Sequence, residues 1–409
     1  MKNGMIERNS RRQSGARRLS RAAAIAAQAA SMLGGIALLA ANAAAQSPTP
    51  DQAVRIYNRI AGVPPSATTL AQMTSAPDPV TAALIATNDP AFYNDTIRNL
   101  AAPWTNRSQS VFVPLDDYIA TVVGMVRDNV PFNTLLSADL VYIASPAASS
   151  ANNLPAYSYS NNNLYAQMDA NSVDLSTALV SSTQSAITGL PAAATAGIIT
   201  TYGASSAFFV NGTNRAMFRF TMMNHLCNDL PSIMDTTRPP DRIRQDVTRS
   251  PGGVSTLFLT NCIGCHSGMD PMAQAFSYYN FDVATNTTLY TPGVTQAKYH
   301  INATNFPLGF NTPDDSWTNR WRAGPNMIMG WNASLPGSGN GAKSLGTELE
   351  NSAQFTNCQV TRVFQDVCFR SPSNTADFNQ VTSMIASFQS NNYSLRQVFA
   401  EAAAYCMGN

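Results

Sequence analysis

The 409-residue sequence contains few residues that bind transition metals: three histidines and six cysteines. It has no second CxxC and no HxxxH, so it lacks the paired ligand motifs of a structural zinc site. No basic run follows Arg21, so nucleic acid is not an expected partner. No segment after residue 45 has about 18 uninterrupted apolar residues, so we expect no stable membrane span in the mature chain.

Residues 1–45 have the pattern of a bacterial export signal. Seven basic residues up to Arg21 precede the small, apolar stretch Ala22–Ala41, and Ala43-Ala44-Ala45 offers an A-x-A cleavage site. The alternative is a retained membrane anchor, but Gln28 interrupts this weakly apolar stretch. We therefore expect a periplasmic or secreted protein. The signal holds seven basic residues and one acidic residue, which leaves 18 basic and 23 acidic residues, a net charge of about −5.

The motif that carries chemistry is Asn261-Cys262-Ile263-Gly264-Cys265-His266. A CxxCH sequence is the attachment signature of a c-type haem. Each thiol adds to one vinyl group of the porphyrin, and the next residue then lies under the iron. We expect Cys262 and Cys265 to hold one covalent haem c, with His266 as the metal ligand. A redox dithiol and half a zinc site are the alternatives, and neither requires the adjacent histidine.

The residue on the other face of the iron would decide the function. A methionine or histidine there gives a closed electron carrier, whereas an open face allows oxygen or peroxide chemistry. Met327 and Met329 follow His266 at 61 and 63 residues, near the spacing of many small cytochromes. His300 and His225 are further candidates. The sequence leaves these four residues and an open site as alternatives.

Four cysteines remain beside the haem pair: Cys227, Cys358, Cys368 and Cys406. An even number in an exported protein predicts two disulfides, because that compartment is oxidising. Three pairings are open. Buried free thiols are the alternative.

Apolar residues at i, i+3, i+4 and i+7 predict many short helices, and so a mainly α fold with long irregular loops. Asp51 is a candidate N-cap for the first helix, and Asp270-Pro271 reads as an N-cap and first helical residue. A small strand pair is expected between Asp282 and Ile301. The expected helices cover residues 51–60, 67–73, 78–86, 90–103, 115–129, 135–142, 173–185, 208–227, 344–370, 377–388 and 395–405.

The helices group into parts of different composition. Ser145–Asn163 is rich in Ser, Asn, Ala and Pro and lacks periodicity, so it reads as an exposed connection. Length also favours two domains. The expected parts are a signal peptide (1–45), a helical N-terminal domain (46–144), a connecting region (145–205) and a haem c-binding cytochrome domain (206–409).

The run from Cys262 to Pro271, continuing to Phe281-Asp282, resembles the haem region of planctomycete-type cytochrome c-domain proteins. The similarity extends more weakly to other parts of the chain, and Ala273 stands where that family usually has glycine. The resemblance implies an exported monohaem c-type cytochrome with a helical N-terminal domain. It names no substrate. Its weaker parts are Phe218–Cys227, Leu230-Pro231, Arg238-Pro239-Pro240, Phe355, Cys358 and Val363-Phe364, with Gly62–Pro65, Trp104 and Asn129–Phe132 in the N-terminal part.

We therefore expect an electron carrier that works with a redox partner protein. A haem-dependent oxidase or peroxidase acting on an external substrate is the alternative, and it stays open because the chain is far longer than one small carrier needs. No polar distal group for such an enzyme can be identified from the sequence. In a third hypothesis, the helical N-terminal part docks a partner protein.

Overall fold

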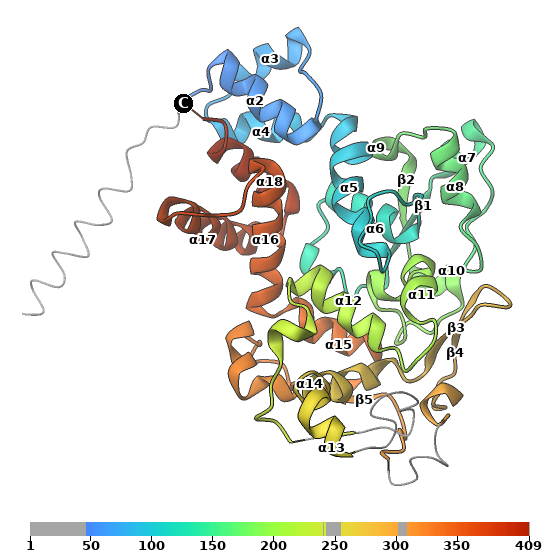
Figure 1. Cartoon of the computed structure of the whole chain (residues 1–409). Coiled ribbons are helices and arrows are strands. Elements are labelled where there is room, and N and C mark those ends of the chain that lie inside the picture. Colours follow the sequence, from blue (N-terminus) through green and yellow to red (C-terminus); the bar gives the residue numbers. More distant parts are fainter. Residues whose placement is uncertain (1–45, 240, 243–254, 302–308, 409) are drawn as a thin grey trace, which may run out of the picture.

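A computed structural model describes residues 46–239, 241–242, 255–301 and 309–408 of the chain. The fold is mainly helical, as the sequence predicts, and its strands are few and short (Figure 1). The proposed export signal, residues 1–45, lies outside the described residues.

The first helices begin at side-chain caps. The cap of α2 is Thr49 rather than the expected Asp51, because Thr49 and Gln52 form a reciprocal capping box. Asp78 caps α4 and Pro79 is its first residue, which agrees with the sequence pattern. These helices are α2 (Pro50–Ala61), α3 (Ala67–Thr74) and α4 (Pro79–Ala86).

The two ends of the described chain pack together. Helix α18 (Leu395–Tyr405) contacts both α2 and α4, and α16 (Ala353–Cys368) contacts α18 (Figure 1). A third C-terminal helix, α17 (Thr375–Ser390), packs on both α16 and α18. Buried apolar residues form a cluster that runs from Ala53 to Ala403. A domain boundary near residue 145 stays a prediction.

The middle of the chain surrounds the buried helix α6 (Asp117–Arg127). Strand β1 (Val141–Ala144) lies against α6 and pairs antiparallel with β2 (Leu179–Ser182). The other elements here are η1 (Phe92–Ile97), α5 (Arg98–Ala101), η2 (Ala102–Thr105), η3 (Phe132–Thr134), α7 (Pro146–Asn152), α8 (Asn163–Ala170), α9 (Leu175–Ala178), α10 (Gln184–Thr188), η4 (Gly197–Thr200) and α11 (Tyr202–Phe208).

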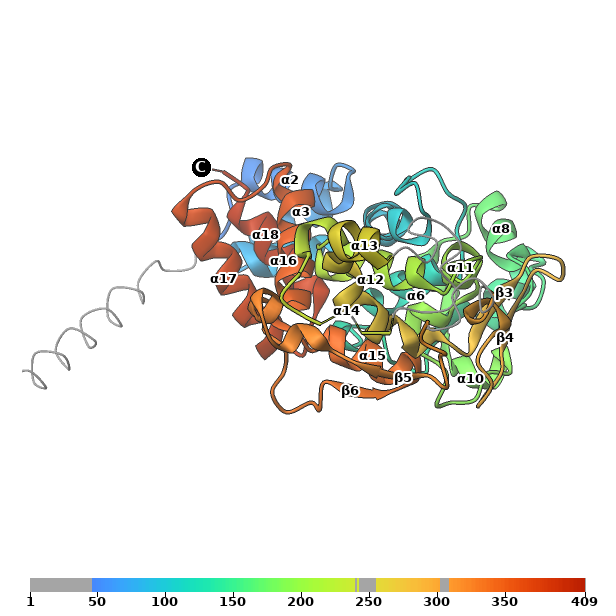
Figure 2. The same cartoon turned by 60° about the horizontal axis from the view of Figure 1, so that its bottom comes forward.

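The part that contains the CxxCH motif is built on α12 (Arg215–Leu226) and α14 (Ile263–Ala273), which pack side by side (Figure 2). Its strands pair antiparallel as β3 (Tyr279–Asp282) with β4 (Thr287–Tyr290), and β5 (Ser316–Thr318) with β6 (Ser338–Asn340). Its other elements are η5 (Leu230–Ile233), α13 (Ser255–Leu257), η6 (Phe258–Cys262), η7 (Gln274–Phe276), η8 (Ala297–Tyr299), η9 (Arg320–Arg322), η10 (Pro325–Met329) and α15 (Gly341–Glu350).

Several expected helices differ from those in the structure. The helix expected over 208–227 is broken between α11 and α12, where Asn211, Gly212 and Asn214 adopt positive φ. The stretch 135–142 ends in β1 instead of forming a helix, because pairing with β2 outweighs its local propensity. The block over 344–370 is two helices, because Ser352 caps a new helix at α16.

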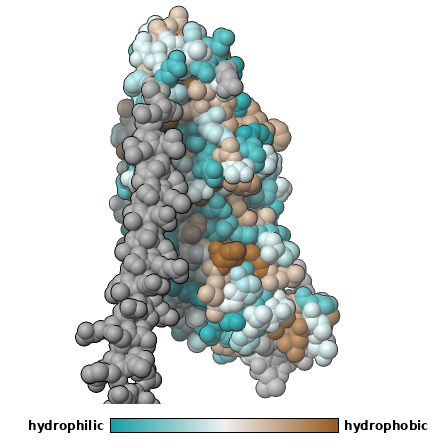
Figure 3. Space-filling model, turned by 90° about the vertical axis from the view of Figure 1, so that its left-hand side faces the viewer, coloured by the Kyte–Doolittle hydropathy of each residue, from teal (hydrophilic) through white to brown (hydrophobic). Residues whose placement is uncertain are grey.

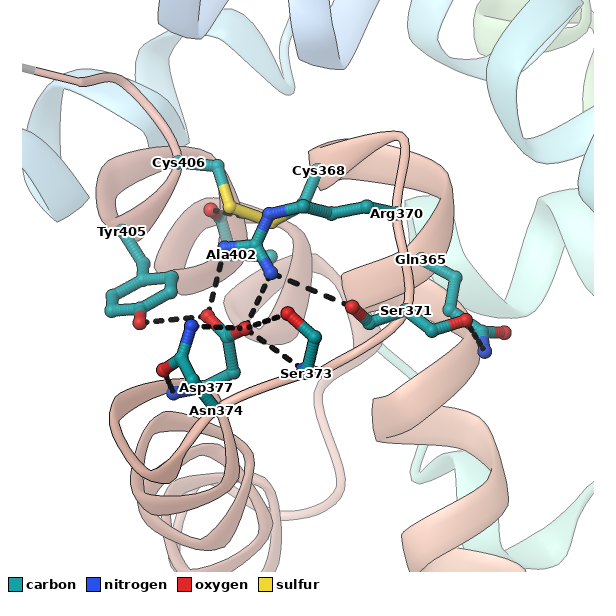
Figure 4. A network of polar contacts seen from close by, with 10 residues as sticks. All are labelled: Gln365, Cys368, Arg370, Ser371, Ser373, Asn374, Asp377, Ala402, Tyr405 and Cys406. Carbon is teal, nitrogen blue, oxygen red and sulfur yellow. Dashed lines mark hydrogen bonds and ion pairs between the residues drawn. A yellow bond between two sulfur atoms is a disulfide. The ribbon is translucent and has the colours of Figure 1, made fainter.

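Two disulfides use the four remaining cysteines. Cys227 pairs with Cys358, which links the end of α12 to α16. Cys368 pairs with Cys406, which links the end of α16 to the end of α18. The structure therefore selects one of the three pairings that the sequence leaves open. Beside the second disulfide, the buried carboxylate of Asp377 contacts several side chains at once (Figure 4), among them Arg370, Asn374 and Tyr405.

The surface seen from the left of Figure 1 is mixed. Hydrophobic colour there is confined to small patches between hydrophilic residues (Figure 3). Within the described part of the chain, no helix combines the length and the apolar character that crossing a bilayer requires.

Candidate haem-attachment site

The CxxCH motif lies at the start of helix α14. Cys262, Cys265 and His266 are each partly exposed, whereas the intervening Ile263 and Gly264 are buried. Both cysteines are free thiols. The helix therefore presents its three chemically useful side chains toward one accessible side and packs its other side on the protein.

The buried side of α14 is fixed by close backbone packing. Gly268 lies so near Trp321 that an added Cβ would be 2.0 Å from the indole nitrogen. The Ser267 hydroxyl donates to the carbonyl of Asp235 at 2.7 Å, and the Asp235 N–H donates to the carbonyl of Gly264 at 2.8 Å. These contacts fix the position of the motif relative to Asp235 and Trp321.

Asp270 and Pro271 do not begin a helix, contrary to the sequence expectation. Helix α14 already starts at Ile263 and passes through Pro271, two residues before its end at Ala273. A capping aspartate gives its oxygens to backbone N–H groups. In the structure those oxygens accept hydrogen bonds from Arg215 and His266 instead.

His266 Nδ1 lies 3.0 Å from Asp270 Oδ2, one helical turn along α14. The Asp270 side chain is 1% exposed. Arg215 of α12 neutralises it through two contacts, Nε to Oδ1 at 2.8 Å and Nη2 to Oδ2 at 3.2 Å. Because Nδ1 faces the carboxylate, Nε2 is the ring nitrogen that is placed to ligate iron. Metal-bound histidines commonly donate their other N–H to a carboxylate in this way.

A pocket of about 460 Å³ adjoins the motif. Its walls include three guanidinium groups and three apolar side chains: Arg107, Arg215, Arg219, Phe220, Leu230 and Met269. Cys265 Sγ lies 3.7 Å from the Leu230 carbonyl, so the pocket wall touches the motif there, although Cys262, Cys265 and His266 do not themselves line the pocket. The volume is in the range of cofactor pockets, and two of its arginines, Arg215 and Arg219, are paired with Asp270 and Asp229.

The Cys265 thiol has the wrong character for a redox dithiol. Burial, followed by the negative charges at Asp229 and Cys262, raises its pKa above the ordinary value. A reactive dithiol instead requires a lowered pKa, because the thiolate is the nucleophile. A zinc site also lacks support, since no group of three or more His, Cys, Asp or Glu side chains in the described ranges is arranged to hold a metal ion. A haem needs only His266 and the two thiols from this segment, and these residues fit it.

The four candidates for the sixth ligand lie outside the lining of this pocket. His225 is buried, and its Nε2 is 2.7 Å from the hydroxyl of Tyr118. Burial, together with nearby Arg362, lowers the pKa of His225 well below its ordinary value, as suits a neutral core histidine. His300 follows η8 and is partly exposed.

Met327 and Met329 lie on η10, with exposed fractions of 57% and 2%. Asn326 of the same element donates to the carbonyl of Ile233, and the next residue, Met234, packs on Gly264. These contacts join the element of the two methionines to the motif, and α12, the helix of His225, packs directly on α14.

Sequence reasoning missed Asp270 as a partner of His266 and missed the three arginines. The i, i+4 spacing of His266 and Asp270 is a signal that could have been used, because such residues share a helix face. The arginines come from segments distant in sequence.

Searches of family models, curated proteins and solved structures gave no match for this chain.

Proposed function

We propose that the chain is an exported monohaem c-type cytochrome that transfers electrons to or from a redox partner protein. The observation that carries the proposal is the CxxCH motif on α14 with a buried carboxylate behind its histidine. The pocket of cofactor size beside the motif adds support. We include in this proposal that the motif region is related to that of planctomycete-type cytochrome c-domain proteins.

The cysteines attach the cofactor by addition. At each of Cys262 and Cys265, the sulfur would form a bond to a vinyl carbon, and the thiol hydrogen would go to the neighbouring carbon. No atom leaves, so the mass of the chain rises by that of one intact haem. His266 then presents Nε2 to the iron, held in position by Asp270. When bound, the haem supplies an iron that cycles between Fe(III) and Fe(II).

Export is part of this proposal. Haem c is attached after transport, and the two disulfides suit an oxidising compartment. The expected signal in residues 1–45 supplies the route.

A haem-dependent oxidase or peroxidase is the second candidate. The length of the chain, far beyond what one small carrier needs, keeps it as an alternative. An iron face without a protein ligand would accept peroxide or carbon monoxide.

The experiment is to produce the full chain in a host that attaches haem c and to record spectra of both redox states. A methionine–sulfur band near the red edge, or a low-spin bis-histidine spectrum, supports the carrier. High-spin iron that binds added peroxide supports the second candidate. The matched variants are C262A/C265A, which should contain no covalent haem, and N261A, which changes an exposed neighbour and should retain it. Haem bound equally by both variants would contradict the assignment of the thiols.

A further inference from the structure

We propose that Asp270 is a positioning residue for His266: it fixes the imidazole with its proton on Nδ1 and lowers the reduction potential of the iron. This inference rests on the proposed haem site and deepens it. Three structural observations carry it, namely the contact with the ring, the burial of the carboxylate and the cation behind it.

The geometry selects one ring nitrogen. Asp270 Oδ2 is 3.0 Å from His266 Nδ1, and both residues are on α14 at i, i+4 spacing, so the helix itself sets their distance. The ring of Phe258 packs edge-on against the imidazole at 5.7 Å between centroids. Together the carboxylate and the phenyl ring restrict rotation of the imidazole. On a neutral ring, a carboxylate at this position requires the proton on Nδ1, which leaves the Nε2 lone pair for the iron.

The burial makes the interaction strong. Asp270 is 1% exposed, so water screens its charge little. A buried carboxylate without partners would be costly, and Arg215 compensates it with two N–H donors. The acceptor behind the proposed iron ligand is therefore a charged carboxylate. A neutral backbone carbonyl would be enough to accept the hydrogen bond from the ring N–H. This points to a role for the charge as well as for the hydrogen bond.

The sign of the effect follows from electrostatics. An anionic acceptor at Nδ1 increases the electron density at Nε2, which raises the basicity of the ligand. A more basic ligand stabilises Fe(III) relative to Fe(II) and so lowers the reduction potential. The positive charge of Arg215 compensates part of the negative charge of Asp270 and so weakens this effect. Removing the charge at Asp270 should therefore raise the potential, and removing the charge at Arg215 should lower it.

The chain offers a matched control for D270N. Asp229 is also bound to an arginine of α12 by two contacts, here Arg219 at 2.7 and 2.6 Å. It also acts electrostatically on Cys265. D270N and D229N each remove one carboxylate near the motif. Only D270N changes the group that accepts from His266.

The experiment has two readouts. The first is the midpoint potential of the haem-loaded chain, which D270N should raise by more than D229N does, whereas R215Q should lower it. The second uses nitrogen NMR of the haem-free C262A/C265A chain, in which three histidines give a simple spectrum. The neutral His266 ring should carry its proton on Nδ1, and the D270N change should reduce that preference while D229N leaves it unchanged.

The outcomes separate the two levels of the proposal. A wild-type chain without covalent haem would refute the proposed function, yet the NMR readout would still test the role of Asp270. A D270N protein that contains covalent haem but has the reduction potential and the His266 tautomer of the wild type would overturn the role of Asp270 and leave the proposed function intact. If D270N does not fold, D270E keeps a charged acceptor and R215Q leaves Asp270 in place. Wild-type tautomer populations in D270E together with a lowered potential in R215Q would support the inference, and the absence of either would overturn it.

Discussion

The packing of α14 on Trp321 gives the sharpest stability prediction, the replacement of Gly268 by alanine. An added Cβ would lie 2.0 Å from the indole nitrogen, and Trp321 is fully buried and has no open space to move into. Overpacking of this kind typically costs about 1–3 kcal/mol, and a contact this short belongs at the upper end. Alanine gains about 0.5–1 kcal/mol over glycine in a helix interior. The net loss for G268A should therefore be about 2 kcal/mol or more.

Gly264 provides the control on the same helix. Its added Cβ would meet the Cβ of Met234 at 3.1 Å, a contact that a shift of a few tenths of an ångström would relieve. The helix-propensity gain should then dominate, so G264A should lie between about 0 and 1 kcal/mol more stable than wild type. Urea unfolding followed by helical circular dichroism would measure both, compared at equal m. Equal midpoints for the two variants would refute the packing argument.

Three other predictions concern a disulfide and two buried carboxyl groups. Removing the Cys227–Cys358 disulfide as C227A/C358A opens a loop with a sequence separation of 131 residues, and should cost about 4–5 kcal/mol in urea unfolding; a loss below about 1 kcal/mol would contradict it. Asp377 has a pKa held below its ordinary value of 3.8, chiefly by its hydrogen bond from Arg370, so its stabilisation is present at neutral pH and lost in acid. D377N should thus lower the thermal midpoint at pH 7 but less and less below about pH 4, and a constant gap would be the contrary result. Burial raises the pKa of Glu350 to about 8, so the folded state holds a proton that the unfolded state releases, and stability should fall as pH rises from about 4.5 to 8. E350Q should flatten that slope, and identical slopes would refute the assignment.

The sequence predicted local features where the local signal matched the tertiary structure. The helical periodicity of α2 corresponds to a buried face formed by Ala53, Ile56, Tyr57 and Ile60, whereas α6 is buried on all sides. The break after Phe208 was missed because the apolar residues on both sides of the polar turn Asn211-Gly212-Thr213-Asn214 were read as one helix. A left-handed residue leaves little trace in the hydrophobic pattern, so periodicity alone cannot place such a break.

The candidate site divides in the same way. The CxxCH motif is contiguous and could be read directly, and the even count of other cysteines predicted two disulfides. Their pairing could not be read, because it depends on which helix ends meet. Arg107 and Arg219 reach one pocket from different elements, and neither has a local signature. Asp270 was assigned to a helix cap because Asp-Pro is a strong local signal, but its oxygens serve Arg215 and His266.

The measurement that tests the central claim most directly is the intact mass of the mature protein after acid–acetone extraction. We expect the wild-type chain to be heavier by one complete haem and to keep its colour. The C262A/C265A chain should be uncoloured and should lack the added mass. A wild-type chain whose mass equals that of the bare polypeptide, or whose pigment passes into the acetone, would contradict this claim.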